Sequence, residues 1–463
     1  MTATDIRTTT ERIDRLRATF ASGRTRPLEW RERQLDALAR MLHERGDDLV
    51  AAIAADLGRP RFEGWLADIA SSIRDVEHNR KHLRSWARAQ KVRKPREFFA
   101  ARAEIIREPL GVVLIIAPWN YPVNLLLMPL AAALAAGNTV VLKPSELTPT
   151  VSSALARIIP RYLDPEAVTV VEGGVEETTE LLTLPFDHIL YTGNGRVARV
   201  VATAAAAHLT PVTLELGGKS PVIVDHDANL KVTAKRIVWG KFLNAGQTCI
   251  APDYVLAHTS IHDALVDAMV QVVRDHFGAD PQASASLGRI VNERHTERLL
   301  GLIAGGGFER VACGGTGDVA SHYVAPTILV GVDRDAEVMR DEIFGPILPV
   351  LRVESVDDAI GYVNAHDKPL ALYVFGSDDT AEHVLASTSS GGACVNDVMT
   401  HFLIGDLPFG GVGPSGTGKY HGKAGFDLFS NQKSVVDRPT WFEAPMLYPP
   451  YTSRKEKIVR RVF

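Results

Sequence analysis

The spacing of apolar residues separates the chain into regions with different predicted structure. Between residues 8 and 90, apolar positions recur at helical spacing, for example at Leu35, Leu38 and Leu42. The segment Gly58-Arg59-Pro60 interrupts this spacing with strong turn residues. We therefore expect an N-terminal region of helices with a break at Gly58.

From about residue 105 onward, short apolar runs alternate with helix-like stretches. Strands are predicted at 112–116, 139–142, 168–171, 188–191 and 211–214, and an Ala/Val-rich helix at 196–208. This alternation favours a parallel sheet with helices on both faces. It returns between 219 and 395, with strands at 222–224, 254–256 and 372–375, which predicts a second α/β domain. Beyond Asn396 the chain is rich in Gly, and an extended, Pro-containing tail is expected from Arg438.

Composition limits the class of protein. A chain of 463 residues exceeds one ordinary hydrophobic core, so two or three domains are expected. Its 46% apolar and 23% charged residues are typical of a soluble globular protein, and a net charge of -4 gives no reason to expect nucleic acid or an anionic membrane as partner. The N-terminus has no apolar signal core, and Asn and Pro interrupt the most apolar region, 110–142. We expect no membrane span.

Three cysteines, Cys249, Cys313 and Cys394, are widely spaced and odd in number. They form neither a metal-ligand pattern nor a disulfide framework, which favours a reducing cytoplasm and predicts no metal site. Cys249 follows Gly246-Gln247-Thr248 in a predicted bend, and Glu215 precedes a Gly-Gly turn. A thiol and a separate carboxylate suggest a nucleophile and a base, although an isolated cysteine is more often a small buried apolar residue.

A second pattern gives Glu215 another role. Gly193, Gly195 and Ala198 stand between a predicted strand and a helix, as in the glycine-rich fingerprint that binds a dinucleotide pyrophosphate. An acid about twenty residues later contacts the ribose in that fingerprint, and Glu215 has this spacing. A competing acid, Glu146, follows the strand 139–142. From these patterns alone both assignments remain open.

Taken together, a set of ordered motifs resembles the aldehyde dehydrogenase superfamily, specifically its class 3 branch, from about residue 10 to 440. The motifs are Pro118-Trp119-Asn120-Tyr121-Pro122, Lys143-Pro144-Ser145-Glu146, Tyr191-Thr192-Gly193-Asn194, Glu215-Leu216-Gly217-Gly218-Lys219, Gly246-Gln247-Thr248-Cys249, Glu342-Ile343-Phe344-Gly345-Pro346 and Pro408-Phe409-Gly410-Gly411-Val412-Gly413. The segments 172–179 and 420–423 resemble class 3 in particular.

The resemblance implies a mechanism for three residues. Cys249 attacks an aldehyde carbon, Asn120 stabilises the resulting oxyanion, and Glu215 activates the water that hydrolyses the thioester. The expected reaction is NAD(P)-dependent oxidation of an aldehyde, medium- or long-chain aliphatic or aromatic, to its acid.

The resemblance also implies a cofactor site for NAD, with NADP as a second cofactor. Lys143 and Glu146 match the adenine-ribose contacts, Glu342 the nicotinamide-ribose contact, and Phe344 the residue packed near the nicotinamide. Trp119, Leu216, Gly193, Gly195 and Ala198 are assigned to the same site. Relatives usually carry Thr at position 195 and Gly at 198, so the way the pyrophosphate is held departs here from the family pattern.

The implied fold has a Rossmann-like parallel-sheet NAD-binding domain (1–92 and 109–217), a second α/β catalytic domain (218–410), and bridging segments (93–108 and 411–440), followed by a tail (441–463). Class 3 relatives are dimers, and 432–436 resembles their late bridging strand in a two-stranded arm, so a homodimer is expected.

Two alternatives compete with aldehyde oxidation to the acid. Transfer of the acyl group to coenzyme A is disfavoured because CoA-acylating relatives usually lack the base that stands here as Glu215. A catalytically inactive binding or structural member is disfavoured because such a protein is expected to lose Cys249, Asn120 or Glu215, and all three are present.

Overall fold

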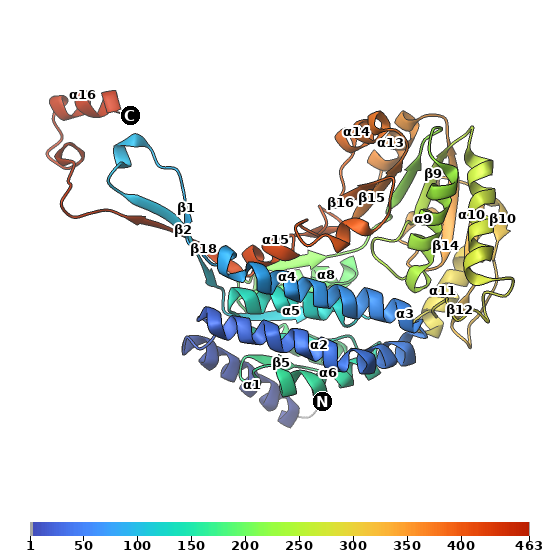
Figure 1. The fold of residues 1–463 in the computed structure, drawn as a ribbon, viewed down its shortest axis with the longest axis horizontal. Coiled ribbons are helices and arrows are strands. Elements are labelled where there is room, and N and C mark those ends of the chain that lie inside the picture. The colour runs from blue at the N-terminus through green and yellow to red at the C-terminus, as the bar shows by residue number, and fades with distance from the viewer. Residues whose placement is uncertain (1–2, 463) are drawn as a thin grey trace.

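A computed structural model describes residues 3–462, and its chain begins with long helices (Figure 1). They are α1 (Ala3–Ala21), α2 (Leu28–Leu57), α3 (Arg61–Gly64) and α4 (Ser71–Trp86), with a π-helical turn, η1 (Trp65–Ala70), between the last two. The predicted break is confirmed, because Gly58 ends α2 in the left-handed conformation with φ 55°.

The first sheet has six strands in the order β17-β7-β6-β3-β4-β5. Its strands are β3 (Val112–Ile116), β4 (Thr139–Lys143), β5 (Val168–Val170), β6 (His188–Thr192), β7 (Val212–Glu215) and the antiparallel edge strand β17 (Gly416–Thr417). The first five are mutually parallel and match the predicted strands to within a residue or two. The fold is therefore α/β with a parallel sheet, as the alternation predicts.

Helices cover both faces of this sheet. They are α5 (Asn124–Ala136), α6 (Pro149–Tyr162), α7 (Val175–Leu181) and α8 (Gly195–Ala206), in addition to the N-terminal ones. Val113 and Ile115 of β3 pack in one cluster with α2, α4, α5 and α6. Val112 and Leu114 pack in another cluster with α1, α7 and α8. Since successive strand residues point to opposite faces, α4 and α8 lie on opposite sides of the sheet.

The second sheet has seven strands in the order β10-β13-β14-β9-β8-β15-β16. They are β8 (Pro221–Val224), β9 (Tyr254–His258), β10 (Phe308–Cys313), β13 (Thr327–Val332), β14 (Ile347–Val353), β15 (Ala371–Phe375) and β16 (Gly392–Val395). Only β10 runs antiparallel to its neighbour. Its helices are α9 (Leu230–Phe242), α10 (His262–Phe277), α11 (Glu293–Ala304), α12 (Glu337–Arg340), α13 (Val356–Asn364) and α14 (Asp378–Ser387), and β11 (Gly317–Asp318) with β12 (Tyr323–Val324) forms a small ribbon beside them.

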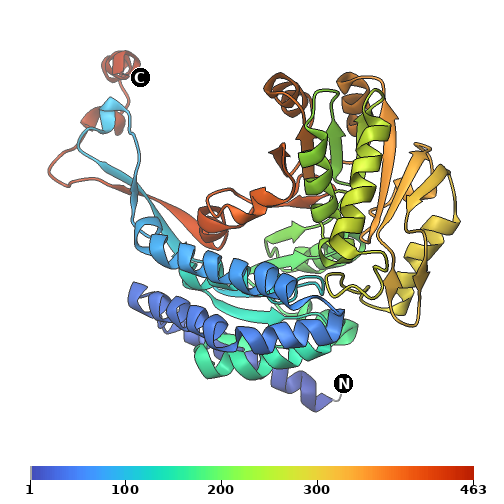
Figure 2. The same cartoon turned by 45° about the vertical axis from the view of Figure 1, so that its right-hand side comes forward.

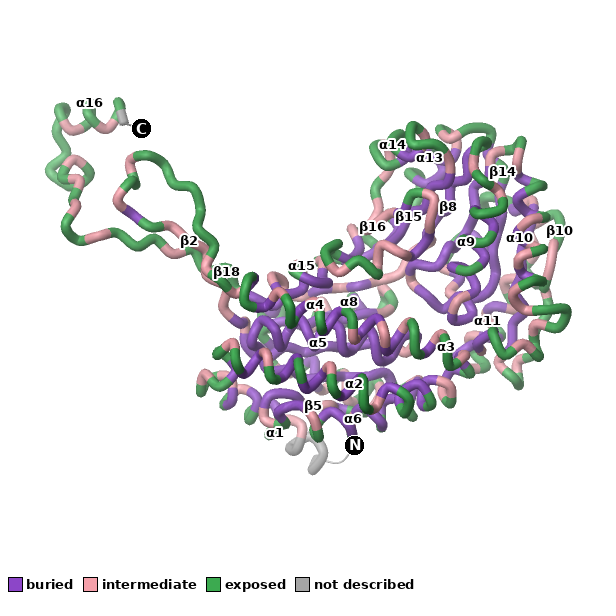
Figure 3. Tube along the Cα trace, in the orientation of Figure 1, coloured by how far each residue is buried: buried purple, intermediate pink, exposed green. Residues whose placement is uncertain are grey.

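An arm projects from the body in two views of the molecule (Figures 1 and 2). It contains β1 (Gln90–Lys91), β2 (Arg102–Pro109) and β18 (Ser430–Asp437), which form an antiparallel sheet. The short helix α15 (Gly422–Leu428) precedes β18 in the chain. The expected two-stranded arm therefore has three strands, because Gln90 and Lys91 pair with β2. Most of the arm is exposed or half-buried, in contrast to the buried interiors of the two larger sheets (Figure 3).

The C-terminal tail is not extended throughout, which corrects the expectation from sequence. Residues 454–461 lie in a helix, α16 (Ser453–Val462). Its charged side chains stabilise helical turns, as the 2.8 Å ion pair between Glu456 and Arg460 shows. Among the helices of residues 3–462, none combines the length and apolar character needed to cross a bilayer.

Candidate active site

One large cavity, about 1360 Å³ in volume, lies where the two sheets approach each other. Ten of the twelve residues singled out from the sequence line it: Cys249, Glu215, Asn120, Trp119, Lys143, Glu146, Gly193, Leu216, Glu342 and Phe344. Gly195 and Ala198 do not. The cavity thus brings together residues from the carboxyl ends of β3, β4, β6 and β7 with residues of the second sheet region, as open parallel sheets generally do at this edge.

Asn120 stands in the loop that follows β3, and a buried ion pair holds this loop. Arg59 contacts the carboxylate of Asp68 at 2.5 Å, with both side chains fully buried, and also donates to the carbonyl oxygen of Asn120. Asp68 accepts hydrogen bonds from the backbone N–H groups of Val123 and Asn124 at 3.0 and 2.9 Å. Because each charge has partners, the pair fixes the loop without leaving an uncompensated buried ion.

The loop that carries Cys249 packs directly on the Asn120 loop. The side-chain amide of Asn120 donates to the carbonyl oxygen of Gln247 at 3.0 Å. The hydroxyls of Tyr121 and Thr248 lie 2.6 Å apart. Gly246 has φ 75°, and a Cβ atom there would lie 2.3 Å from the carbonyl oxygen of Gly345, so only glycine fits this bend. Cys249 is therefore held on a turn with little freedom.

Cys249 is half-buried, and its thiol is free. Burial, with smaller contributions from the carboxylates of Glu342 and Glu215, raises the pKa of Cys249 to about 12. A thiol in this environment needs a base or a positive neighbour before it becomes a nucleophile. The other two cysteines, Cys313 and Cys394, lie outside the cavity lining.

Glu215 ends β7 with its side chain almost fully buried. Its residue is 2% exposed, and neither carboxylate oxygen has a hydrogen-bond partner. Burial raises the pKa of Glu215 well above its usual range, and the nearby Lys419 lowers it by less. Backbone approaches this carboxylate closely, because a Cβ atom on Gly410 would lie 2.6 Å from Oε1 of Glu215. An unpartnered carboxyl with a raised pKa has the properties of a general base.

A second carboxyl group, that of Glu342, also lies near Cys249. Burial, together with the negative charge of Asp253, raises the pKa of Glu342 to about 8. Next to it, Phe344 has a positive φ of 48°. The ring of Phe344 meets that of Trp119 edge-on, with centroids 5.4 Å apart. The aromatic pair joins the β3 loop to the second domain across the cavity.

Lys143 and Glu146 lie at the carboxyl end of β4. Lys143 is 2% exposed, and its Nζ donates to the carbonyl oxygens of Pro144 and Gly173 at 2.8 and 2.6 Å. Burial lowers the pKa of Lys143, while Glu146 and Glu177 raise it. Glu146 is exposed at the cavity wall. A buried ammonium and an exposed carboxylate at a strand end can both reach the hydroxyls of a ribose.

The glycine-rich segment fits a dinucleotide only in part. A Cβ atom on Gly193 would lie 2.2 Å from the hydroxyl oxygen of Tyr191, so packing within the protein already demands glycine there. At Gly195 the nearest atom to an added Cβ is 3.6 Å away, which leaves room for a side chain. Ala198 is 2% exposed and packs inside the cluster beneath α8. Asn194 caps α8 by accepting from Val197 N–H at 3.0 Å, and Asn194, Arg196 and Val197 line the cavity.

Several lining residues were not identified from the sequence. His295 and Arg298 come from α11, and the ring of His295 lies 5.8 Å from that of Trp119. Burial lowers the pKa of His295 to about 4, so this ring is neutral. No sequence pattern joins α11 to the strands of the first sheet, and only the packing of the domains brings them together. Among residues 3–462, no group of three or more His, Cys, Asp or Glu side chains lies together as metal ligands.

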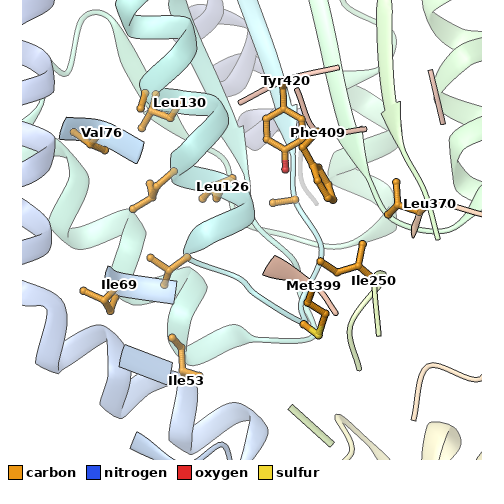
Figure 4. Packing of buried hydrophobic residues seen from close by; sticks show 14 of the residues in the cluster. Ile53, Ile69, Val76, Leu126, Leu130, Ile250, Leu370, Met399, Phe409 and Tyr420 are labelled. Carbon is orange, nitrogen blue, oxygen red and sulfur yellow. The ribbon is translucent and has the colours of Figure 1, made fainter. Parts of the chain in front are cut away.

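Tyr420 and Phe409 lie next to each other in the buried cluster beside α5 (Figure 4), and both line the cavity. Their rings are 5.9 Å apart and nearly perpendicular. Ile250 and Met399 lie near them in the same buried cluster, which continues to Leu126 of α5. The hydroxyl of Tyr420 is buried and has no hydrogen-bond partner. Tyr420 belongs to a motif used for the resemblance, although the sequence assigned it no role.

Comparisons with known proteins find relatives that match nearly the whole chain. The family model described as the aldehyde dehydrogenase family matches residues 2–435. The chain is similar to the dog (Canis lupus familiaris) protein named "Aldehyde dehydrogenase, dimeric NADP-preferring", with 47% identity over 95% of this chain and 97% of the relative. It is also 47% identical to mouse (Mus musculus) aldehyde dehydrogenase family 3 member B1, over 97% of this chain and 96% of that protein.

The fold has a solved counterpart. A substrate-bound state of Staphylococcus aureus AldH superposes with a TM-score of 0.95 at 41% identity, covering 98% of this chain and 99% of that one. An NAD-dependent aldehyde dehydrogenase from Sinorhizobium meliloti gives a TM-score of 0.87 at 30% identity, covering 97% and 89% of the two chains.

Proposed function

Because the chain belongs to the aldehyde dehydrogenase family and oxidises aldehydes with NAD(P), we propose that Cys249, Glu215 and Asn120 carry out the reaction. The observation that carries this proposal is their convergence on one cavity from two separate loops and the end of strand β7. A nucleophile, a base and an amide donor are the groups that acyl chemistry at an aldehyde carbon needs.

In the first step the thiolate of Cys249, after its proton has passed to solvent, forms a bond from Sγ to the aldehyde carbon as the π bond of the carbonyl breaks. The carbonyl oxygen becomes an oxyanion, and the amide of Asn120 with the backbone N–H of Cys249 donates hydrogen bonds to it. Removing one such donor typically costs about 3–4 kcal/mol of transition-state stabilisation. When bound, NAD(P) would supply the two-electron oxidant that takes hydride from this carbon, which would leave the acyl group on Cys249 as a thioester.

Glu215 serves the second half of the reaction. Its carboxylate takes a proton from a water molecule as that water attacks the thioester carbon, and the C–S bond to Cys249 breaks to release the acid. The raised pKa of Glu215 and its lack of hydrogen-bond partners support this role. A hydrolytic base at this position also argues against acyl transfer to coenzyme A.

For the cofactor, we propose that Lys143 and Glu146 hold the adenine ribose and Glu342 the nicotinamide ribose, with Trp119, Leu216 and Phe344 beside the nicotinamide. Gly193 and the N-terminus of α8 are proposed to bind the pyrophosphate. Gly195 and Ala198 do not line the cavity, and we propose that they affect pyrophosphate binding by setting the shape of the first turn of α8. NAD is the proposed main cofactor because the exposed Glu146 repels a 2′-phosphate. NADP is the proposed second cofactor for two reasons. The dog relative is named NADP-preferring, and the positively charged Arg196 lines the same cavity.

The proposed substrates are medium- or long-chain aliphatic and aromatic aldehydes. The lining contributed by α5, by α9 with its C-cap residue and by the loop 399–409 is largely apolar, with Leu125, Trp239, Leu243, Phe402 and Phe409 among its residues. Burial of a hydrocarbon chain against such side chains is favourable by about 25 cal/mol per Å².

We further propose the division into an NAD-binding domain (1–92 and 109–217), a catalytic domain (218–410) and bridging segments (93–108 and 411–440). Homodimerisation through the arm is supported by the word dimeric in the name of the dog relative and by the exposed edge of β18. The cytoplasm is the proposed location, since all three cysteines are unpaired.

The experiment that tests the catalytic proposal follows reduced cofactor by absorbance with octanal and benzaldehyde. Cys249→Ser is expected to abolish turnover, because a serine hydroxyl is far less acidic than a thiol. Cys313→Ser, outside the cavity, is the matched control and is expected to keep its activity. Added coenzyme A is expected to leave the wild-type rate unchanged. Substantial turnover by Cys249→Ser would contradict the assignment, and strict dependence on coenzyme A would favour acyl transfer.

A further inference from the structure

The aldehyde side of the cavity can be located from the sheet faces. The residues proposed to hold the adenine ribose and the pyrophosphate lie at the ends of β4 and β6 and at the start of α8. The segment η1–α4 lies on the opposite face of the same sheet from α8. It reaches the cavity through Ser71, whose hydroxyl oxygen accepts a 2.6 Å hydrogen bond from Asn124, four residues after Asn120. An aldehyde chain bound at Cys249 therefore extends toward α4.

One face of this helical segment lines that side of the cavity. Ala67, Ala70, Ser71 and Arg74 all belong to the lining, and their spacing places them in one row. Three small side chains leave open space along the row, and an arginine stands at its end. Helix α9 and the loop 399–409 contribute Trp239, Met399, Phe402, Leu403 and Phe409 to the same cavity, and none of these is charged. Among the described lining residues from these elements, Arg74 alone carries a charge.

Arg74 is also without a partner inside the protein. The other two arginines of α4 are paired, Arg80 with Asp36 at 2.9 Å and Arg84 with Glu32 at 2.6 Å. Within residues 3–462, no carboxylate forms an ion pair with Arg74 and no group accepts a hydrogen bond from it, and the side chain is exposed. Its neighbour Asp75 is turned inward, where it accepts hydrogen bonds from Asn79 and from the backbone of Gly422. The guanidinium is therefore available to a ligand.

We propose that Arg74 selects aldehydes that carry an anionic group at the end remote from the aldehyde, such as ω-oxo carboxylic acids. This inference rests on the proposed function, since it assumes that Cys249 receives the aldehyde. An apolar channel with a single cation at its outer end matches a hydrocarbon chain that ends in a carboxylate. The planar guanidinium binds carboxylates through two parallel hydrogen bonds, which a methyl ester cannot match.

The test compares ω-oxo carboxylic acids with their methyl esters over a series of chain lengths. Wild type is expected to show the highest ratio of acid to ester kcat/KM at one chain length, the length that spans from Cys249 to Arg74. Arg74→Met keeps much of the side chain and removes the charge, and is expected to lower that ratio about 2- to 5-fold. Arg74→Glu is expected to lower it further by repulsion. Arg80→Met, on the same helix, is the matched control and should leave the ratio unchanged.

Salt gives a second measurement. The acid preference of wild type is expected to shrink as ionic strength rises, because exposed charges are screened. An acid-to-ester ratio that is equal in wild type and Arg74→Met would overturn the role of Arg74 and leave the proposed function intact. If no reduced cofactor forms with either series at any chain length, the proposed substrate class and this inference are both refuted.

Discussion

The side-chain amide of Asn120 donates a 3.0 Å hydrogen bond to the carbonyl oxygen of Gln247, two residues before Cys249. The amide of Asn244 donates to the same oxygen at 3.1 Å, from outside the cavity lining. Two asparagines thus support the nucleophile loop, but only Asn120 can also reach a substrate. This difference separates a structural role from a catalytic one.

Asn120→Ala is expected to lower kcat about 10²–10³-fold, because an oxyanion donor is lost. Asn244→Gly is the matched control, since glycine accepts the left-handed conformation that Asn244 adopts with φ 51°. The control removes a hydrogen bond to the same carbonyl and is expected to retain most of its kcat. Equal losses in steady-state kinetics would mean that Asn120 acts only by supporting the loop.

Glu215→Gln is expected to separate the two halves of the reaction. Formation of the thioester needs no activated water, so the variant should release a burst of reduced cofactor of up to one equivalent per active site. Steady turnover should then fall about 10²–10⁴-fold, because deacylation has lost its base. Mass spectrometry of the quenched variant should find the acyl group on the peptide that contains Cys249.

Two other outcomes of that experiment would change the mechanism. A missing burst with intact NAD binding would mean that Glu215 acts earlier, by taking the proton of Cys249. Undiminished steady turnover would remove Glu215 from catalysis.

The buried carboxyl of Glu215 also predicts a dependence of stability on pH. Since burial raises its pKa in the folded state, the fold binds this proton more tightly than the unfolded chain does. The stability that wild type gains from this proton is full below the ordinary pKa of 4.5 and is lost as the pH rises toward the folded-state pKa. Glutamine does not ionise, so Glu215→Gln does not lose stability in this way as the pH rises. The Tm of the variant is therefore expected to exceed that of wild type increasingly above pH 4.5, by about 1–3 °C at pH 8.

The measurement is a thermal melt of both proteins from pH 4 to pH 9, with Glu166→Gln, an exchange at a half-buried surface carboxylate, as the control. A difference in Tm between wild type and Glu215→Gln that stays constant with pH would contradict a raised pKa for Glu215.

Glu146→Gln is expected to shift the ratio of kcat/KM values toward NADP, because the repulsion of a 2′-phosphate is removed. Titration of each cofactor by fluorescence gives the same comparison for binding alone. The rival interpretation assigns the ribose contact to Glu215. If the NADP-to-NAD ratio of kcat/KM values stays the same in Glu146→Gln but changes in Glu215→Gln, the rival interpretation is correct.

The arm predicts a dimer in solution. Light scattering at micromolar concentration is expected to report twice the mass of one chain. Val436, 62% exposed on β18, is expected to lie at the contact, so Val436→Lys should shift the equilibrium toward monomer. Leu209→Lys, at a site 90% exposed between α8 and β7 and outside the arm, controls for the added charge. A wild-type monomer would refute the arm as an interface.

Local patterns determined much of this protein. The runs at 112–116 and 139–142 are apolar throughout, and a strand buried on both faces requires that composition. The turn at Gly58 and the bend at Gly246 were also visible in the sequence, because both positions have a positive φ that favours glycine. The motifs around Asn120, Glu215 and Cys249 are short and contiguous, so their resemblance to a family identifies them from the order of residues alone.

Contacts between distant segments were decided by the tertiary structure alone. Ala198 belongs to the glycine-rich pattern, yet it packs beneath α8 and not at the cavity. Residues 454–461 form a helix, where the prolines of the tail had predicted an extended segment. His295 from α11 and Arg74 from α4 reach the cavity because two sheets and their helices pack against each other there. Periodicity records which face of an element is buried, but which other element covers that face depends on packing across the whole chain.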